Sequence, residues 1–453
     1  MVANPPTYNR RQMILAGLGA VTAVVSGPLA VNRGGAQTPG PVELRPKTGF
    51  IRLGGGEGAE GLPMVGYGGS APGPLIVARR GEEIAAQLIN DWSEPTLVHW
   101  HGLRVPSEID GFPFLSRTPI GSGQNLAMRL PTKDAGTFWY HATPASQFSR
   151  GLSGPLIINE SEPIDVDRDL MLILQDWQAA RASAPTLTIN GKEQPSLQVR
   201  RGERVRLRLI NATAGRVLSI QLPEQPAWVM AIDGQPAEPF IAKDSRVMIA
   251  PGNRLDLFVD ITADGGTSDI PVLVETANTA PVPGALLVIE GERPGPRRDG
   301  VPSALPANPL PAQIDLRNAV RISADLSAGA QTASSTSRKQ APKGLQMLEW
   351  RPLPNSVDAV GSPAFTIQRG RTVTAMFTNP GSRAAVIHTH GHSFRLLDNL
   401  DDGWKPFWLD TLLVAPQQTA RIAFRADAAG RWAITARPLA DPNDEWWTWF
   451  QAS

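Results

Sequence analysis

The sequence contains no cysteine, and only 6 of its 453 residues are histidine. Without cysteine the chain cannot form a disulfide, offer a thiolate to a metal or use a cysteine nucleophile. It also lacks an excess of either charge, because 43 lysine and arginine residues stand against 42 aspartate and glutamate residues. This balance gives no electrostatic reason to expect nucleic acid or another strongly charged partner.

Sustained helical periodicity is scarce as well. The chain has 43 glycines and 42 prolines, and short alternating segments lie between them. Many short strands joined by turns are typical of an all-β protein. At roughly 150 residues per domain, a chain of this length predicts about three domains.

The N-terminus carries a candidate export signal. Paired arginines at residues 10–11 precede a moderately apolar run of small residues at 15–31. This pattern resembles a bacterial twin-arginine signal, which we assign to residues 1–36 with cleavage near Ala30 or Ala36. An uncleaved membrane anchor is the alternative, but glycines and a proline interrupt the run. We therefore expect an exported, periplasmic protein without a stable membrane span, and the twin-arginine translocase as a partner during export.

One segment occurs three times, at residues 80–90, 201–211 and 369–379. Each copy has an Arg-Gly turn, a stretch that alternates polar and apolar residues, and a closing asparagine. Such self-similarity indicates a repeated structural unit. In the second copy, residues 204–209 alternate arginine with an apolar residue, which predicts a strand with one solvent face and one core face.

The repeats divide the chain into three related β-domains. A stretch rich in proline, serine, alanine and arginine separates the second domain from the third. The predicted segments are the domains at 37–160, 161–292 and 316–453, a linker at 293–315, a strand at about 320–326 and a loose insertion at about 328–344.

The histidines gather in three short motifs, and none lies in the second domain. They are His99, His101, His141, His388, His390 and His392. Residues i and i+2 of a strand project to the same face, so the motifs at 99–101 and 388–390 predict side-by-side imidazole pairs. Such pairs suit copper, zinc or iron, and pairs from the first and third domains could meet at the seam between them. The alternative is a set of structural histidines in the core or on the surface.

Motifs around these histidines resemble the multicopper oxidase family, which includes laccases and ascorbate oxidase. They lie at residues 99–102, 109–111, 137–141, 151–158, 408–411 and 430–432. The resemblance implies an all-β fold of three cupredoxin-like Greek-key β-barrel domains. It also implies copper as the cofactor, in a mononuclear blue (type 1) site that takes electrons from substrate and a three-copper cluster that reduces dioxygen.

By this resemblance every ligand of the blue site is missing. The family's ligand positions fall on Ala385, Ala436, Asp441 and Trp446. Without a thiolate there is no blue copper and no covalent route from it to the cluster. The resemblance therefore implies that ordinary laccase turnover is excluded.

The resemblance also implies a reduced three-copper cluster. His99 and His388 match the ligands of its type 2 copper. One type 3 copper retains His101 and His141, but Arg437 replaces its third ligand. If Arg437 keeps the direction of the ligand that it replaces, it places a fixed positive charge where a cation would bind.

The other type 3 copper retains only His390, because Thr143 and Thr435 replace its remaining ligands. We therefore expect one or two copper ions, or none if the histidines are relics. His392 matches a position that is usually not a ligand, and we interpret it as structural.

Asp110 matches the family's acid that orients water and relays protons near the cluster, which makes it the candidate catalytic residue. The alternative is a turn aspartate before Gly111, which needs no function. Near the former blue site, three tryptophans occur at 446, 447 and 449. They either fill the core there or form a patch that binds a protein partner.

Two functions remain open, and with them the question of whether the chain is an enzyme. The first is a copper-binding periplasmic protein with a residual oxidoreductase reaction. The second is a redox-inactive periplasmic scaffold with a cell-envelope or division partner, similar to a copper-free, cell-division-associated member of the family. Five of the six histidines at ligand positions favour the first. We expect a monomer in either case.

Overall fold

The computed structural model describes most of the chain after its N-terminal segment. The described residues are 40–54, 61–179, 184–262, 269–276, 279–294, 298, 300–326, 344–397, 407–439 and 444–453. The predicted export signal, nearly all of the predicted insertion and Asp441 lie outside them. No helix in the described part of the chain has the length and hydropathy that a membrane crossing requires.

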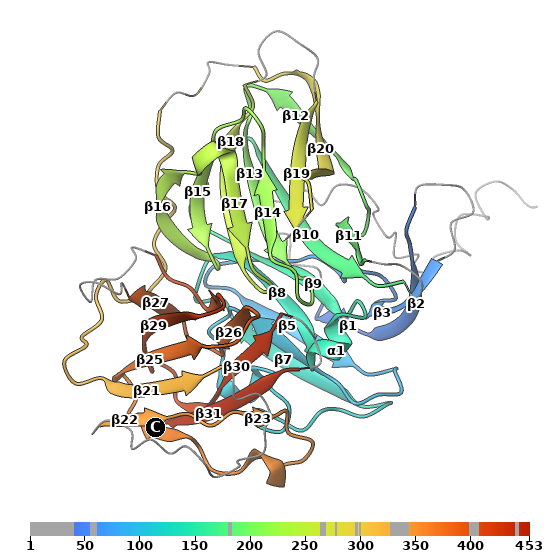
Figure 1. The fold of residues 1–453 in the computed structure, drawn as a ribbon. Helices are drawn as coiled ribbons and strands as arrows, with labels where there is room; N and C mark the ends of the chain where they lie inside the picture. The colour runs from blue at the N-terminus through green and yellow to red at the C-terminus, as the bar shows by residue number, and fades with distance from the viewer. Residues whose placement is uncertain are drawn as a thin grey trace, which may run out of the picture.

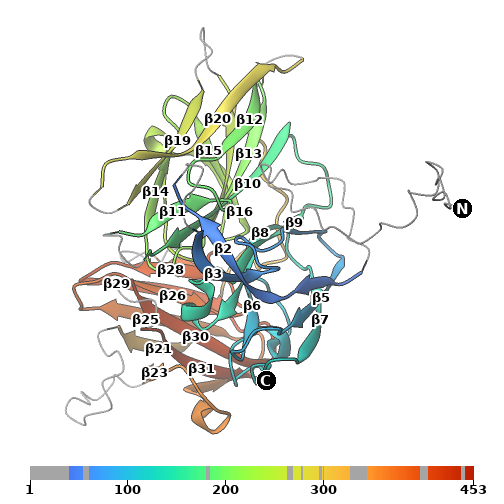
Figure 2. The same ribbon diagram turned by 90° about the vertical axis from the view of Figure 1, so that its right-hand side faces the viewer.

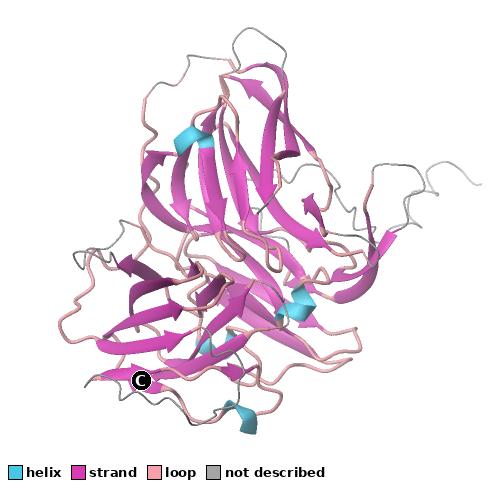
Figure 3. Cartoon of the chain, viewed as in Figure 1, coloured by secondary structure: helices cyan, strands magenta, loops and turns pink. Residues whose placement is uncertain are grey.

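The molecule is built almost entirely of strands, with helical turns only between them (Figure 3). The strands form three units that follow one another along the chain, and each sheet takes its strands from one unit only. The second unit, coloured green to yellow, lies above the other two, whose blue and red strands lie side by side below it (Figure 1). The turned view shows the same arrangement (Figure 2). The prediction of an all-β fold with three repeated units is confirmed.

The first unit contains a four-stranded sheet in the order β4-β9-β8-β6, a three-stranded sheet in the order β1-β5-β7 and the β2-β3 pair. Its elements are β1 (Val42–Leu44), β2 (Pro46–Arg52), β3 (Gly61–Tyr67), β4 (Ile76–Arg79), β5 (Glu83–Ile89), β6 (Leu97–His101), the 3-10 helix η1 (Ser107–Ile109), β7 (Asn125–Pro131), β8 (Gly136–Thr143), α1 (Ala145–Phe148) and β9 (Ser153–Asn159). Strands β6 and β8, which carry histidines, are neighbours in the larger sheet.

The second unit contains a six-stranded sheet, β11-β10-β13-β18-β15-β16, and a five-stranded sheet, β12-β20-β19-β14-β17. Its elements are β10 (Arg168–Trp177), β11 (Thr186–Ile189), β12 (Ser196–Arg201), β13 (Arg204–Asn211), β14 (Leu218–Gln221), β15 (Ala227–Ile232), β16 (Gln235–Ile241), η2 (Lys243–Ser245), β17 (Arg246–Ile249), β18 (Arg254–Asp260), β19 (Ile270–Thr276) and β20 (Val282–Glu292). Aliphatic side chains from both sheets form the core between them.

The third unit contains the sheet β22-β21-β25-β29-β27 and the sheet β23-β31-β30-β26-β28, to which β24 adds beside β31. Its elements are β21 (Val320–Asp325), β22 (Leu345–Met347), β23 (Arg351–Pro352), η3 (Asp358–Val360), β24 (Phe365–Ile367), β25 (Thr372–Asn379), β26 (Ala385–Thr389), β27 (Phe394–Leu397), β28 (Thr411–Val414), β29 (Gln418–Arg425), β30 (Gly430–Pro438) and β31 (Trp446–Ala452). The predicted strand at about 320–326 is β21.

The three sequence repeats occupy equivalent places. Strands β5, β13 and β25 each pair in parallel with the first strand of their unit and antiparallel with a later one. The closing asparagines, Asn90, Asn211 and Asn379, also make the same bonds: each Nδ2 donates to two backbone carbonyls at 2.8–3.0 Å. Each Oδ1 accepts a backbone N–H two residues further on. The repeat in the sequence is therefore a repeated strand with a repeated asparagine clamp.

The predicted solvent face of β13 is wrong, because all eight residues of that strand are buried. Arg206 and Arg208 lie at 1% and 0% exposure. The guanidinium of Arg208 donates to Thr137 on β8 at 3.0 Å, and that of Arg206 donates to Glu160 just after β9 at 3.0 Å. The first unit therefore covers the arginine face of β13. The alternation of charged and apolar residues reflects two buried faces, one in the core of the second unit and one in the interface with the first.

The predicted linker at 293–315 packs between the first two units where it is described. Asn308 is buried, and its side chain bonds both the N–H and the carbonyl of Ala135, at 2.9 and 2.8 Å. Its Nδ2 also donates to Gln235 of the second unit at 2.9 Å. These bonds tie the first unit, the second unit and the connecting chain together.

Candidate metal centre

Five histidines from the first and third units converge on one buried point. In the antiparallel pairing of β6 with β8, His99 lies opposite His141. His388 belongs to β26, and the chain turns directly after His390. Ring centroids across the seam lie 3.9 Å apart for His101 and His388 and 4.2 Å apart for His99 and His390. The predicted meeting of histidine pairs from the first and third domains is what the structure shows.

Local backbone geometry sets this arrangement. Gly391 has a φ of +64°, and a Cβ there would lie 2.1 Å from the ring of Trp432. Gly111 has a φ of +89°, and a Cβ there would lie 1.9 Å from the carbonyl oxygen of Val98 on β6. Glycine is the residue that tolerates both conditions. The two glycines let the turns that carry His390 and Asp110 approach the strands closely.

His99 and His388 face each other through their Nε2 atoms, which are 3.2 Å apart. The other nitrogen of each ring, Nδ1, donates to a backbone carbonyl, that of Asp110 at 2.7 Å and that of Asp410 at 3.0 Å. Because a carbonyl only accepts, the ring protons sit on Nδ1, and both Nε2 atoms present lone pairs. Two lone pairs that face each other at this distance need a shared cation.

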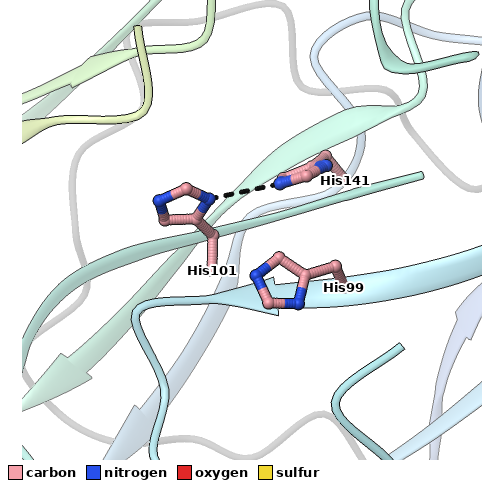
Figure 4. A group of neighbouring side chains, drawn as sticks. All are labelled: His99, His101 and His141. Atoms are coloured by element: carbon pink, nitrogen blue, oxygen red, sulfur yellow. Dashed lines mark hydrogen bonds between the residues drawn. The ribbon is translucent and has the colours of Figure 1, made fainter. Parts of the chain in front are cut away.

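His101 and His141 repeat this arrangement, with Nδ1 of one ring 3.2 Å from Nε2 of the other (Figure 4). Nδ1 of His141 donates to the carbonyl of Ala142 at 2.9 Å. Nε2 of His101 lies 2.9 Å from the hydroxyl of Thr411, which itself donates to Asp410 at 2.8 Å. The hydroxyl therefore accepts from His101, and this second pair also brings two lone pairs together.

Burial keeps these rings neutral. Loss of water lowers the pKa of His99 and His101 well below the usual value, and neighbouring imidazoles add to the effect. Burial also lowers the pKa of His141 to about 3, with the charge of Arg437 among the further causes. Neutral imidazole is the form that binds metal, so the cluster is ready for a metal ion at neutral pH.

Asp110 lies behind His390. Its Oδ2 accepts from Nδ1 of His390 at 2.8 Å, and its Oδ1 lies 3.5 Å from Nδ1 of His99. A carboxylate that accepts from the far nitrogen of an imidazole fixes the orientation of the ring and raises its basicity. Asp110 therefore contacts the cluster and orients the ring of His390, in addition to preceding the turn at Gly111.

A second carboxylate, Asp410, was not among the predicted site residues. Its Oδ1 lies 3.5 Å from His101 and 3.6 Å from His388. Arg254 holds Asp410 with two bonds of 2.8 and 2.6 Å. Burial alone would raise the pKa of Asp410, but Arg254 and the bonds to it hold that pKa well below its usual value.

In the sequence, Asp410 and Thr411 were noted only as part of the motif at 408–411. The motif gave no indication of what either side chain contacts. Asp233 of the second unit completes the group, since its Oδ2 accepts from the backbone N–H groups of Asp410 and Thr411 at 3.2 Å. All three units thus contribute to the support of the histidines.

Arg437 lines the same cavity as the five histidines, a space of about 50 Å³. Its Cζ lies 5.2 Å from the ring of Phe148, and its Nη1 is buried without a hydrogen-bond partner. Thr143 and Thr435 line the cavity too. The sequence analysis expected Arg437 to oppose metal binding only if its side chain faces the histidines. Its place in the cavity wall agrees with that orientation.

Three of the four positions that match the blue site are apolar and packed, and the fourth, Asp441, lies outside the described residues. Ala385, Ala436 and Trp446 belong to one hydrophobic cluster and are 2%, 0% and 6% exposed. Trp447 and Trp449 are also buried, at 0% and 6%. The tryptophans therefore fill the core, as one interpretation expected, and the alternative of an exposed partner-binding patch is wrong.

His392 stands apart from the facing pairs. Its Nδ1 donates to the carbonyl of His390 at 2.9 Å, and its ring packs against Phe424, Trp432 and Phe450. These contacts agree with its interpretation as a structural residue.

Comparison with known proteins gives one consistent family. Three family models, each described as Multicopper oxidase, match residues 57–163, 166–279 and 328–436. The multicopper oxidase MmcO of Mycobacterium tuberculosis is 26% identical over 442 residues, which span 86% of this chain and 82% of that one.

Two solved structures are similar over most of the chain. Lac15, from a marine microbial metagenome, is 28% identical with a TM-score of 0.74, and the match covers 91% of this chain and 100% of Lac15. A multi-copper oxidase from Pseudomonas thermotolerans is 28% identical with a TM-score of 0.75, over 91% of this chain and 99% of that one. The likeness therefore extends over all three units.

Proposed function

Because the chain belongs to the multicopper oxidase family, we propose that it binds copper at the seam between its first and third units and has no blue-copper site. The observation that carries this proposal is the pair of facing imidazole couples, His99 with His388 and His101 with His141, each with its nitrogen atoms 3.2 Å apart. Facing lone pairs in a buried site are costly unless a cation lies between them.

The donor atoms at the two couples fit copper. Metal–imidazole bonds are about 2.0 to 2.1 Å long, so one ion can reach both nitrogens of a couple. Imidazole is a ligand that suits copper, and copper binds such sites more tightly than the other first-row divalent metals. Bound copper would supply one-electron redox chemistry, while the residues of this chain hold the imidazoles neutral and oriented.

The donor atoms at the remaining positions do not fit copper. His390 stands with Thr143 and Thr435 where the family has further histidines, and Arg437 brings a positive charge into the cavity. Three of the four blue-site positions offer alanines and an indole. We therefore propose one or two copper ions and a residual copper oxidoreductase at most, since no thiolate is present to pass electrons to the cluster.

We propose further that the protein acts outside the cytoplasm. The paired arginines at 10–11 and the apolar run after them support export by the twin-arginine translocase and a periplasmic location. That route carries folded proteins, which suits a chain that must bring three units together before its metal centre exists.

The test is metal content together with an electron paramagnetic resonance spectrum, on protein exported natively from copper-replete cells. We expect about one copper per chain with a type 2 signal, which His99→Ala and His388→Ala each abolish. His392→Gln is the matched control, because it removes an imidazole outside the facing couples and should leave copper content unchanged. Copper that dialyses away from the wild type would overturn the proposal.

A redox-inactive scaffold is the second candidate, and Arg437 is the observation that favours it. Its side chain lines the cavity of the histidine cluster, and its positive charge opposes metal loading. A metal-free wild-type protein that remains folded would move the search to periplasmic protein partners with a cell-envelope or division role.

A further inference from the structure

A second cavity, of about 250 Å³, lies at the seam of the first and third units, and none of the five converging histidines lines it. The two units touch closely beside it, since a Cβ at Gly430 would lie 2.1 Å from Oγ of Ser107. Pro106 and Ala429, the chain neighbours of those two residues, line the cavity together with residues 310–311 of the connecting chain. The cavity therefore forms where three segments of the assembled molecule meet.

Cationic side chains dominate the lining of this cavity, and they come from both units. They are Arg104, Lys133, Arg369 and Arg425. The one acidic residue of the lining is Asp427, and Asp134 pairs with Arg104 from outside the lining at 2.7 Å, which leaves an excess of two positive charges. A concave surface lined by one sign of charge concentrates ions of the opposite sign. The cavity thus attracts anions.

Asp427 orients two of these cations without using all of their donors. Nε of Arg369 donates to the backbone carbonyl of Asp427 at 2.7 Å, and Nε of Arg425 donates to its carboxylate. A guanidinium has five N–H donors, and both arginines are exposed. Two guanidinium groups held by one residue therefore keep their Nη donors for a ligand.

One wall of the cavity is apolar. Val105, Leu310 and Trp408 line it, and Trp408 is only 7% exposed. The guanidinium of Arg395 lies over the Trp408 ring, with Cζ 4.8 Å from the ring centroid. Ligand pockets typically combine such walls with a few convergent polar groups. A bare inorganic ion would use the charges of this cavity but not its apolar wall.

We propose that this cavity binds a small organic anion with two or three carboxylate groups, held between Lys133 of the first unit and Arg369 and Arg425 of the third. The proposal goes beyond copper binding and does not depend on it. A guanidinium matches the two-oxygen geometry of a carboxylate, and bonds between charged groups are about twice as strong as neutral ones. An anion that contacts both units also stabilises their docking, because it binds only the assembled molecule.

The volume limits the size of the ligand. The cavity holds about 250 Å³, and one water-sized probe needs about 10 to 15 Å³, so an anion of about ten to fifteen non-hydrogen atoms fits. Propane-1,2,3-tricarboxylate (tricarballylate) is a probe of this size and charge.

The experiment is calorimetric titration of tricarballylate into the full mature protein at pH 7 and constant ionic strength. We expect the wild type to bind it, and Lys133→Gln and Arg369→Gln each to weaken the affinity about threefold to tenfold, because each removes one charged contact at a partly exposed site. Arg129→Gln is the matched control, since Arg129 is 76% exposed on the first unit and lies outside the cavity lining. Its affinity should equal that of the wild type.

Two further probes test the class of ligand. Acetate has one carboxylate, and sulfate has two charges but no apolar part. Each should bind at least about tenfold more weakly than tricarballylate, because it loses either a charged contact or the wall. Equal affinity for either probe contradicts an organic anion with several carboxylates.

The outcomes separate this proposal from copper binding. No heat in the wild type, or unchanged affinity in either cavity variant, overturns an anion held between the two units and leaves copper binding intact. The titration is repeated on metal-free and copper-loaded protein, where equal affinities are expected. Affinity that is lost with the copper would place the anion at the histidine cluster and overturn this site, whereas a protein that binds tricarballylate but no copper overturns the copper proposal alone.

Discussion

Two seams between the units of this protein bury polar side chains, but the hydrogen bonds of those side chains differ between the seams. At the seam of the first and second units, Arg206 and Arg208 are fully buried. Arg206 is bonded to Asp256 and Glu160, and Arg208 to Asp169 with two bonds of 2.7 and 2.9 Å. At the seam of the first and third units, imidazoles face imidazoles and Arg437 has an unpartnered Nη1.

The contrast separates a structural interface from a ligand site. Buried charges that complete one another's hydrogen bonds need nothing from outside, and their role is to hold two units in a fixed orientation. Buried donors and lone pairs that do not complete one another are satisfied only by a bound ion or ligand. The first seam is therefore expected to govern folding, and the second to govern what the folded protein binds.

The largest expected effect is on folding, from Asp256→Ala. This carboxylate accepts from Arg206 at 2.5 Å and from Arg208 at 3.4 Å, and its loss leaves buried guanidinium donors unpaired. Breaking one partner of a buried ion pair costs about 3 to 5 kcal/mol of unfolding free energy. Chemical denaturation of the metal-free protein would measure the change.

The control is Glu83→Ala, at the start of the repeat strand β5. Glu83 pairs with Arg129 at 2.7 Å on the surface, where both side chains are more than half exposed. Exposed pairs of this kind contribute about 1 kcal/mol or less. Equal losses in the two variants would contradict the distinction between a buried and an exposed ion pair.

A smaller effect is expected from pH, through buried imidazoles such as His141 at the histidine seam and His392 in the core of the third unit. The native pKa is about 3 for His141 and about 4 for His392, whereas the unfolded value is about 6.5. Below pH 6.5 the unfolded chain therefore binds protons that the native protein does not. Stability of the metal-free protein should fall as pH drops from 6.5 towards 3, by up to about 1.4 kcal/mol per pH unit for each imidazole.

The arginine seam should contribute only below about pH 5, where its carboxyls begin to bind protons in the unfolded chain. Arg206 and Arg208 hold the pKa of Asp256 below its usual value, although burial acts in the opposite direction. Thermal denaturation of the metal-free protein between pH 7 and about pH 5 would measure the imidazole contribution, and copper should reduce it because metal competes with protons for the rings. A flat profile over this interval would show that the imidazoles bind protons in the native protein as they do in the unfolded chain.

The smallest effect is expected from Asp110→Asn, which should weaken metal binding while leaving the fold intact. The amide keeps the size of the carboxylate but removes the charged acceptor from Nδ1 of His390. Loss of such a partner typically reduces metal affinity about 10-fold to 100-fold. Competition with a chelator of known affinity would measure it, with the exposed Asp315→Asn as control; an unchanged affinity would leave Asp110 with a turn role only.

The sequence predicted those features of the structure that depend on the spacing of residues within one strand or turn. Three copies of one segment predicted three equivalent strands, because a turn, an alternating strand and a closing asparagine are defined within about ten residues. The i, i+2 spacing of histidines predicted side-by-side rings, because strand geometry fixes that direction. The resemblance to a known family supplied the rest of the cluster.

Contacts between units could not be predicted in the same way. Alternation in β13 shows that its two faces differ, but only the docking of the first unit shows that the arginine face is buried. The bonds that Asp233 and Arg254 make to Asp410 join residues far apart in the chain. No local pattern distinguishes them from the other charged residues of the second unit.

The packed core around Ala436 has a consequence for redesign. Ala436 pairs with Trp446 in the ladder between β30 and β31, and both belong to the cluster that contains Ala385. Cysteine at 436 and histidine at 385 would place two ligands in a space that indole and aliphatic side chains already fill. Introducing a metal site here would therefore require the C-terminal strand to be repacked at the same time.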